Sequence, residues 1–233
     1  VRTSDGVFDG FKLQNIQRGL DTHAAVAASS VRAIKTHNGI TGLTFDLAAQ
    51  SLTNSLDNME CSAIDTPLNG AQGELVFDLQ DIGNDMEWYL GLRRHTFPKY
   101  ANETDFGLKF DYVVHYDSTT GDLCYYQWEM DSSNYLQQTE LNYWEVGTRV
   151  DFTEKYSWDE NPDGYRYLRF QLDNQAVVVA LSVDNSTWVT LTNSSKAVGY
   201  SNYALFPSAA IMEKEKKVVI TKFNGVPNYD VTQ

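Results

Sequence analysis

The chain has 233 residues, which is long for an average single domain but common for one β-sandwich. Lys and Arg total 18 against 31 Asp and Glu, so the formal charge of −13 repels nucleic acid and anionic membrane surfaces alike. No apolar run in the sequence approaches the roughly 20 residues that cross a bilayer. We therefore expect neither a nucleic-acid partner nor insertion into a membrane.

The sequence starts at Val1 without an initiator Met or a signal peptide, which predicts a processed product or a piece of a larger protein. Cys61 and Cys124 are too few for a disulfide framework and have no CxxC spacing. Sequons for N-glycosylation begin at Asn102, Asn185 and Asn193, about as many as chance predicts. Neither feature establishes a compartment.

The first part of the chain differs in pattern from the rest. Ala24–Lys35 is rich in small residues and predicts a short helix. From Gly39 onward the apolar residues recur with a period of two. We therefore divide the chain into an N-terminal extension, residues 1–38, which is helical or extended, and a β-sandwich domain, residues 39–233.

Alternating apolar and polar residues mark the strands of this domain. Leu75, Phe77 and Leu79 are typical of a half-buried strand, and Trp88–Leu92 is typical of a fully buried one. The ranges with a strand pattern are Leu43–Leu47, Leu75–Leu79, Trp88–Leu92, Phe110–Tyr116, Cys124–Met130, Thr148–Thr153, Arg166–Leu172, Ala176–Val183, Trp188–Leu191, Ala209–Met212 and Lys217–Phe223. So many strands at short spacing predict an all-β, antiparallel two-sheet sandwich or jelly roll.

The most informative strands flank the turn Asp117–Asp122 and predict a β-hairpin over Phe110–Met130. Alternation divides the residues of each strand between two faces. We assign to the core face Phe110, Tyr112, Val114, Tyr116, Cys124, Tyr126, Trp128 and Met130. The opposite face then carries Asp111, His115, Tyr125, Gln127 and Glu129.

Two segments carry a resemblance to a known superfamily. Tyr167–Leu191, a strand, a tight turn, a strand and a short turn before Trp188, resembles the same run in concanavalin A-like jelly rolls. Tyr203–Ile211 with Val218–Phe223 resembles the closing strands of lectin-like and SPRY-like members. The resemblance implies the fold and not one function, since the superfamily holds lectins, laminin-G-type modules, lyases, glucanases, peptide-binding modules and viral or phage attachment domains.

Two enzyme classes of this superfamily fit the residues poorly. Glu129 and Asp131 resemble the carboxylate strand of glucanases, but Asn134 stands where a third carboxylate is expected. A polysaccharide lyase needs a neutralising residue, a His and a Tyr around one uronate, and His115, Gln127, Tyr125 and Arg149 supply the residue types without the strand motifs. The negative charge of the chain also disfavours a polyuronate. We therefore expect no catalytic residue, and keep a lyase or glucanase as an alternative.

Metal binding has equally little support in the sequence. Asp111, Asp117 and Asp122 offer oxygen atoms that suit Ca²⁺, but the spacing found in calcium-dependent legume-type lectins does not occur. A solvated turn explains these carboxylates better. The four His residues are scattered without a second His or Cys at ligand spacing. We expect neither a metal nor another cofactor.

A sugar-binding surface needs an aromatic ring for the C–H face of the sugar and polar side chains for its hydroxyls. The face of the hairpin opposite the core has these parts, and exposed indoles in polar segments would add an interface. The ligand-binding candidates are Asp111, His115, Tyr125, Gln127, Glu129, Trp144, Trp158, Tyr165, Tyr167 and Arg169. The alternative is that this face packs on other parts of the chain and that both Trp side chains anchor their loops.

The sequence therefore favours a non-catalytic recognition module that binds a glycan or a cell-surface protein. By analogy with the attachment domains of the superfamily, we expect it in an extracellular or virion-surface protein. The alternative from another class is a structural module that mediates contacts in a homo-oligomer or a larger assembly.

Overall fold

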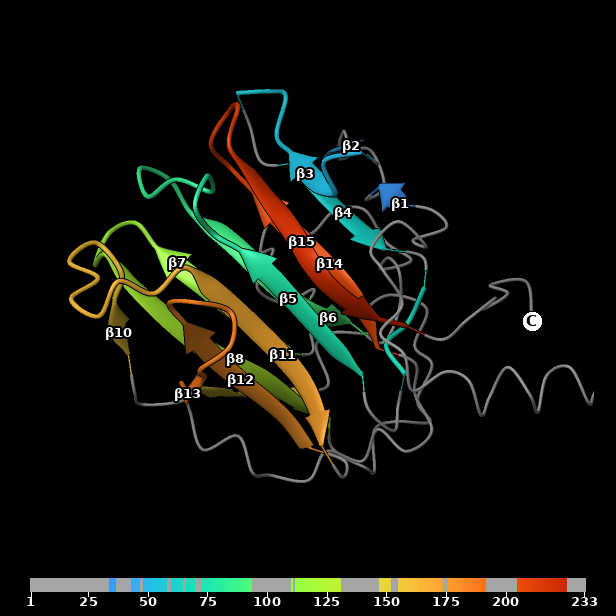
Figure 1. Cartoon of the computed structure of the whole chain (residues 1–233), viewed down its shortest axis with the longest axis vertical. Coiled ribbons are helices and arrows are strands. Elements are labelled where there is room, and N and C mark those ends of the chain that lie inside the picture. Colours follow the sequence, from blue (N-terminus) through green and yellow to red (C-terminus); the bar gives the residue numbers. More distant parts are fainter. Residues whose placement is uncertain are drawn as a thin grey trace, which may run out of the picture.

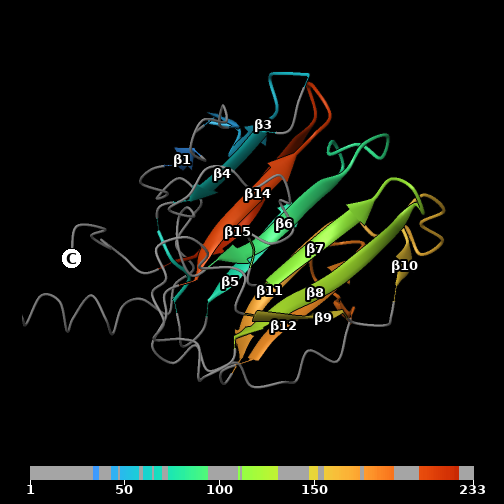
Figure 2. The ribbon, with the colours of Figure 1, turned by 180° about the vertical axis from the view of Figure 1, so that it is seen from behind.

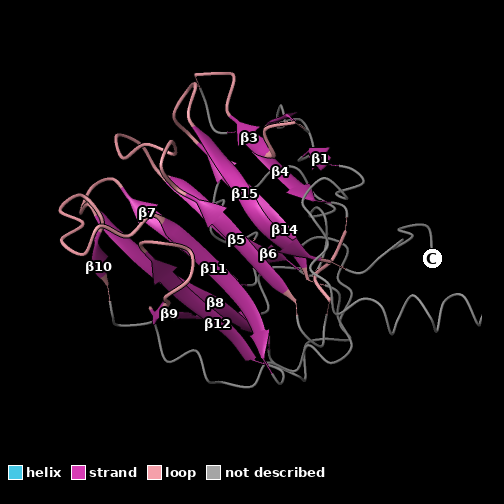
Figure 3. Cartoon of the chain, viewed as in Figure 1, coloured by secondary structure: helices cyan, strands magenta, loops and turns pink. Residues whose placement is uncertain are grey.

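The computed structural model describes residues 34–36, 43–46, 48–57, 60–64, 66–69, 73–93, 110, 112–130, 147–151, 155–173, 176–191 and 205–225. All regular structure in these ranges is β-strand, arranged in two layers (Figures 1 and 3). The same ranges contain no helix that is long and apolar enough to span a membrane.

The first layer is an eight-stranded antiparallel sheet. In spatial order its strands are β1 (Ile34–Thr36), β4 (Glu60–Ile64), β14 (Phe206–Ile211), β6 (Trp88–Arg93), β7 (Tyr112–Asp117), β8 (Asp122–Met130) and β10 (Tyr156–Ser157), while β9 (Gly147–Asp151) also pairs with β8.

The second layer is a seven-stranded sheet that packs face to face on the first. Its order is β13 (Val189–Thr190), β12 (Ala176–Ser182), β11 (Tyr167–Asp173), β5 (Glu74–Asp78), β15 (Lys217–Asn224), β3 (Ser51–Thr53) and β2 (Thr44–Asp46), and each neighbouring pair is antiparallel. The predicted fold class, an all-β antiparallel two-sheet sandwich, is confirmed.

The core lies between the two sheets and follows the period of two. The seven-stranded sheet contributes the buried set Leu75, Phe77, Leu168, Phe170 and Leu172, and the eight-stranded sheet contributes Trp88, Leu90, Leu92, Tyr112, Val114 and Tyr116. Burial of each such side chain stabilises the fold by about 1.5–3 kcal/mol, so the sequence pattern fixes which face of each strand turns inward.

The predicted faces of the β7–β8 hairpin are right for β7 and wrong for β8. The register pairs Asp117 with Asp122 and Val114 with Tyr125. The four residues between Asp117 and Asp122 therefore place odd-numbered residues of one strand opposite even-numbered residues of the other. As a result Leu123 and Tyr125, not Cys124, join the core between the sheets.

Phe110 is a second correction to the predicted core face. It lies outside the main core, in a smaller apolar cluster with Tyr89, Val113 and Ala210 on the outer face of the eight-stranded sheet. Tyr89 and Phe110 stack with ring centroids 6.4 Å apart. This outer face is therefore packed where these residues lie, rather than open to solvent.

The N-terminal part of the chain enters the description at β1. Ile34 and Lys35, the end of the predicted helix, belong to this strand and pair with β4 instead. The rest of Ala24–Lys35 lies outside the described residues. The division of the chain at residue 38 stays a prediction.

Several loops meet at one end of the sandwich, as both views of the ribbon show (Figures 1 and 2). Main-chain hydrogen bonds join neighbouring loops there: the Asn54 amide donates to Lys216, the Lys217 amide to Asp81 and the Trp158 amide to Gly121, at 2.8–3.0 Å. We call this region the loop end. These bonds hold the main chains of the loops in fixed relative positions.

Candidate functional site

A pocket of about 390 Å³ lies at the loop end, between the β5–β6 loop and the β10–β11 loop. We call it the loop-end pocket. Trp158 and Tyr165, two of the residues singled out from the sequence, lie in its wall. The full lining is Leu79, Gln80, Gly83, Asn84, Trp158, Asp159, Asn161, Tyr165 and Arg166.

Trp158 packs on two stacked aromatic rings of the core, which form a column. Its ring meets Trp88 edge to face at 6.4 Å, and Trp88 stacks on Tyr116 at 5.7 Å. The indole N–H of Trp88 donates to the Gly83 carbonyl oxygen at 3.2 Å, which ties the column to the β5–β6 loop. Trp158 is half-buried, so it serves both as a loop anchor and as part of the pocket wall.

Asp159 connects the two loops that form the pocket. Its Oδ1 lies 2.7 Å from the Tyr116 hydroxyl and 3.3 Å from Nδ2 of Asn84. Burial, together with the carboxylate of Asp159, raises the pKa of Tyr116, which therefore stays a hydrogen-bond donor. The second oxygen, Oδ2, lies beside Gly121, where a Cβ atom would approach it to 2.5 Å.

Asn161 fixes the shape of the β10–β11 loop. Its φ of 36° places it in the left-handed region, which Asn tolerates better than most residues. Its Oδ1 accepts hydrogen bonds from the Tyr165 amide at 2.9 Å and from the Tyr156 hydroxyl at 2.8 Å. Its Nδ2 donates to the Tyr165 carbonyl oxygen at 2.9 Å. Asn161 therefore positions the two tyrosines.

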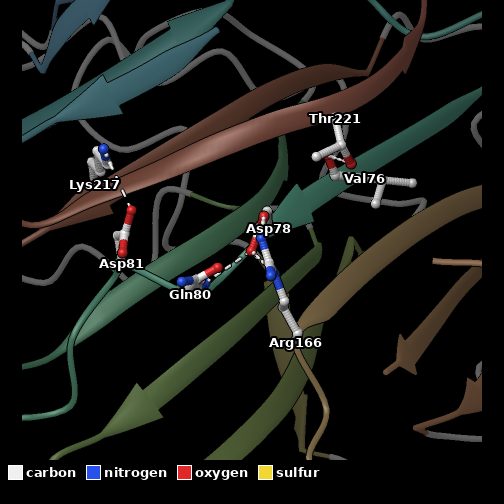
Figure 4. A network of polar contacts seen from close by, with 7 residues as sticks. All are labelled: Val76, Asp78, Gln80, Asp81, Arg166, Lys217 and Thr221. Carbon is white, nitrogen blue, oxygen red and sulfur yellow. Dashed lines mark hydrogen bonds and ion pairs between the residues drawn. The ribbon is translucent and has the colours of Figure 1, made fainter. Parts of the chain in front are cut away.

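Arg166 and Asp78 form a two-pronged ion pair at the edge of the pocket (Figure 4). Nε and Nη2 of Arg166 donate to the two carboxylate oxygens at 2.8 and 2.6 Å. The main-chain N–H of Gln80 also donates to Oδ1 of Asp78, at 3.0 Å. This pairing holds the guanidinium in one orientation.

The side chains of the pocket divide into a frame and a contact set. Asn161 and Oδ1 of Asp159 hold the loops, since their hydrogen bonds are made within the protein. Gln80 and Arg166 add polar side chains to the lining of the pocket, and Trp158 and Tyr165 add aromatic ones. The arrangement can therefore bind a polar ligand that has one apolar face.

His115 lies away from this pocket, on the outer face of the eight-stranded sheet. Its ring stacks on Tyr89 with centroids 4.2 Å apart, and its Nε2 is 3.7 Å from the Glu87 carboxylate. Only 14% of its side chain is exposed. His115 is therefore packed against its neighbours. The predicted faces placed His115 and Tyr125 on one surface, but Tyr125 lies in the core.

Tyr125 is buried in the main core, with 1% of its surface exposed, so the outward face predicted for it is wrong. Burial raises the pKa of its phenol. Gln127 and Glu129 are described only by their backbone, which pairs with Tyr112 and Thr148 respectively. Asp111 and Trp144 lie outside the described residues.

Tyr167 and Arg169 lie on the outer face of the seven-stranded sheet. The Arg169 guanidinium stacks 4.4 Å above the Trp188 ring and is 3.8 Å from Glu74. Burial lowers the pKa of Arg169, although Glu74 opposes this effect. The Tyr167 ring lies under the guanidinium of Arg166 at 5.2 Å. These two candidates form a separate surface patch next to the pocket, and neither residue lines it.

In the β7–β8 turn, Asp117 and Asp122 are both half-buried. Oδ1 of Asp117 accepts the Thr119 amide hydrogen bond at 2.9 Å, which closes the turn. This contact and the nearby His115 lower the pKa of Asp117 against the opposing effect of burial, which is the largest. Among the described residues, no three His, Cys, Asp or Glu side chains gather in a way that would hold a metal ion.

No family model matches this chain. No curated protein matches it either. Among the solved structures that match, the carbohydrate-binding module CBM66 from Bacillus subtilis is 9% identical and has a TM-score of 0.39, over 83% of this chain and 94% of its own. The SPRY domain of human HERC1 is 13% identical, with a TM-score of 0.40 over 75% and 89%.

The exoplasmic/lumenal domain of VIP36, in a form bound to Ca²⁺ and Man, is 9% identical and has a TM-score of 0.47 over 85% of this chain and 84% of its own. These values record a likeness in overall shape. What each of these proteins binds is a property of that protein.

Proposed function

We propose that this chain is a non-catalytic recognition module that binds a glycan in the loop-end pocket. The observation that carries the proposal is the meeting of two aromatic rings, Trp158 and Tyr165, with the polar side chains of Gln80, Asp159 and Arg166 in one pocket. A sugar ring has apolar C–H faces and a rim of hydroxyls. It therefore matches aromatic walls with polar groups beside them.

Binding without chemistry fits the carboxylates of the pocket better than hydrolysis does. A retaining or inverting glycosidase places two carboxyl groups on either side of the scissile bond. Within the described residues, the lining of the pocket holds one carboxylate, Asp159, and its Oδ1 already holds Tyr116 and Asn84. A single carboxylate held in this way accepts hydrogen bonds from sugar hydroxyls.

The size of the pocket supports the same proposal. A volume of about 390 Å³ lies within the range of roughly 300–1,000 Å³ that is typical of small-molecule sites. The ligand would be held by a frame that is already in place, since Asn161 and Asp159 are hydrogen-bonded without it. A setting at an extracellular or virion surface, with the glycan on a cell-surface partner, belongs to the same proposal.

A glycan array with wild-type protein and matched variants tests this proposal. Gln80→Ala removes an exposed side chain from the pocket, while the main-chain N–H of residue 80 can still donate to Asp78. Loss of one neutral hydrogen bond lowers affinity by about 2–10-fold. Glu160→Ala is the control, because Glu160 is exposed in the β10–β11 loop, the other loop that forms the pocket, but does not line the pocket.

We expect saturable binding to one class of glycan, weakened by Gln80→Ala and unchanged by Glu160→Ala. Equal binding by all three proteins would place the glycan elsewhere on the molecule. Absence of binding across the array would reject the glycan and favour a protein partner.

A further inference from the structure

A second, smaller pocket of about 200 Å³ lies beside the loop-end pocket. We call it the side pocket. It lies where edge strand β10 of one sheet approaches edge strand β13 of the other. Its lining is Lys155, Tyr156, Asp163, Tyr165, Leu181, Val189, Thr190 and Leu191.

The two pockets share one lining residue, Tyr165. The rings of Tyr156 and Tyr165 lie 5.2 Å apart and tilt by 57°. Asn161 fixes both, because its Oδ1 accepts from the Tyr156 hydroxyl and from the Tyr165 amide. A ligand in the loop-end pocket therefore lies next to the side pocket, and one positioned residue lines both.

The side pocket differs in chemistry from its neighbour. Leu181, Val189 and Leu191 give it an aliphatic wall, and Val189 is 50% exposed although it is apolar. The charged residues Lys155 and Asp163 are both exposed. A volume of about 200 Å³ is smaller than most self-sufficient ligand sites, which suits one apolar group of a larger ligand.

We propose that the side pocket binds a small apolar substituent of the glycan, such as an acyl, alkyl or aryl group, while the sugar ring to which it is attached occupies the loop-end pocket. The proposal rests on the glycan site proposed above. Tyr165 contacts both parts of the ligand, the sugar on one side and the substituent on the other. The favoured ligand is therefore an amphipathic glycoside.

Pairs of glycosides that differ only in this group test the proposal. The probes are methyl and phenyl glycosides of galactose, glucose, mannose and N-acetylglucosamine, with binding followed by ligand-observed NMR. Full burial of an apolar group the size of a Phe side chain raises affinity by about 10–100-fold, so a phenyl glycoside that fills the side pocket binds at least on the order of tenfold more tightly than its methyl partner.

Val189→Asp distinguishes binding of the phenyl group in the side pocket from non-specific binding to other apolar surface of the protein. The carboxylate would enter the aliphatic wall and cancel the preference for the phenyl glycoside, while affinity for the methyl glycoside would remain. Val183→Asp is the control, because Val183 is 53% exposed near the same edge but does not line the side pocket.

The outcomes separate the two proposals. A phenyl preference that Val189→Asp abolishes and Val183→Asp preserves supports the side pocket. Equal affinity within each pair, combined with sensitivity to Gln80→Ala, overturns the side pocket and keeps the glycan site. Absence of binding by every probe and across the array overturns both.

Discussion

Asn161 and Tyr165 make two reciprocal hydrogen bonds: the Tyr165 amide donates to Oδ1 of Asn161, and Nδ2 of Asn161 donates to the Tyr165 carbonyl oxygen, both at 2.9 Å. A side-chain amide thus takes the place of a strand partner inside the β10–β11 loop. Tyr165, which lines both pockets, depends on this contact for its position.

Asn161→Gly tests the contact without adding backbone strain, because Gly accepts the φ of 36° that Asn161 adopts. We expect the free energy of unfolding to fall by about 1–3 kcal/mol, since the variant loses the bonds to Tyr165 and to Tyr156. Glycan affinity should fall as well. Urea unfolding and titration with the best array ligand measure the two effects.

Asn185→Gly is the matched control, since Asn185 also has a positive φ, 61°, but lies in the exposed β12–β13 loop. We expect its stability to change by no more than about 0.5 kcal/mol. Equal losses in both variants would show that backbone freedom, rather than the side-chain bonds of Asn161, determines the effect.

Gly121 and Gly164 offer a second matched pair. Both have positive φ, 74° and 69°, so Ala is strained at either position. At Gly121 the added Cβ would also lie 2.5 Å from Oδ2 of Asp159, whereas at Gly164 no atom lies within 4 Å. We expect Gly164→Ala to cost about 1 kcal/mol in stability, and Gly121→Ala to cost more.

The pair also separates stability from binding. Displacement of Asp159 in Gly121→Ala should weaken glycan binding, while Gly164→Ala should leave the position of that carboxylate unchanged. Thermal unfolding and glycan titration of both variants check this expectation. An identical profile for the two would mean that Asp159 can move aside without consequence.

The Arg166 ion pair predicts a graded effect on stability. Two charge-assisted hydrogen bonds join Arg166 to Asp78, a side chain that is 11% exposed. We expect Arg166→Ala to lower the free energy of unfolding by about 1–3 kcal/mol, and Arg166→Lys to recover part of this loss because an ammonium lacks the planar fork.

The control for this series is Lys214→Ala, which removes an ion pair to Asp57 in which both side chains are largely exposed. Exposed pairs of this kind contribute roughly 0–1 kcal/mol. Urea unfolding of the three variants should therefore rank Arg166→Ala as the least stable. Full recovery by Arg166→Lys would contradict a role for the two-pronged geometry.

The strands could be predicted because burial of one face imposes a period of two on the sequence. Leu75 and Phe77, and Leu168 and Phe170, were expected to share the inner side of their strands, and all four lie in the core. The short strands β1 and β10 have only three and two residues. Neither is predicted from the sequence, because Ile34 and Lys35 of β1 fall in the predicted helix and the two residues of β10 are too few to show a period.

The candidate site was predictable only in part. Trp158 is an aromatic residue in a polar segment, and Tyr165 is predicted as an extension of the sugar-binding surface, but Gln80 and Asn84 come from a loop about 80 residues earlier in the chain. No local pattern reports that approach, because it depends on how the sheets stack. Asn161 had a signal that was not used, the turn sequence Asn161-Pro-Asp-Gly164.

The error at Tyr125 had a physical cause that the sequence contained. The turn Asp117–Asp122 was recognised, but its four inner residues oblige residues of opposite parity to face each other, as Val114 and Tyr125 do. The side chain of Tyr125 therefore points into the core with Val114. A one-residue change in register moves every side chain of a strand to the other face.

The burial of Tyr125 has a consequence for stability at high pH. Burial raises the pKa of its phenol above the ordinary value of 10, whereas the unfolded chain ionises near that value. The pKa difference between the folded and unfolded states contributes to the free energy of unfolding. This contribution is present in full below pH 10 and is lost as the pH rises from there toward the folded pKa. The free energy of unfolding should therefore fall by up to about 1.4 kcal/mol per pH unit for this residue.

Urea unfolding at pH 8, 9, 10 and 11 measures this slope in wild type, Tyr125→Phe and Tyr167→Phe. Tyr125→Phe keeps the ring in the core and removes the titrating group, so its stability should fall less steeply above pH 10 than that of the wild type. Tyr167→Phe is the control, since it removes the same hydroxyl from a half-buried position on the outer face of its sheet. Equal slopes in all three proteins would mean that the Tyr125 phenol reaches water in the folded state.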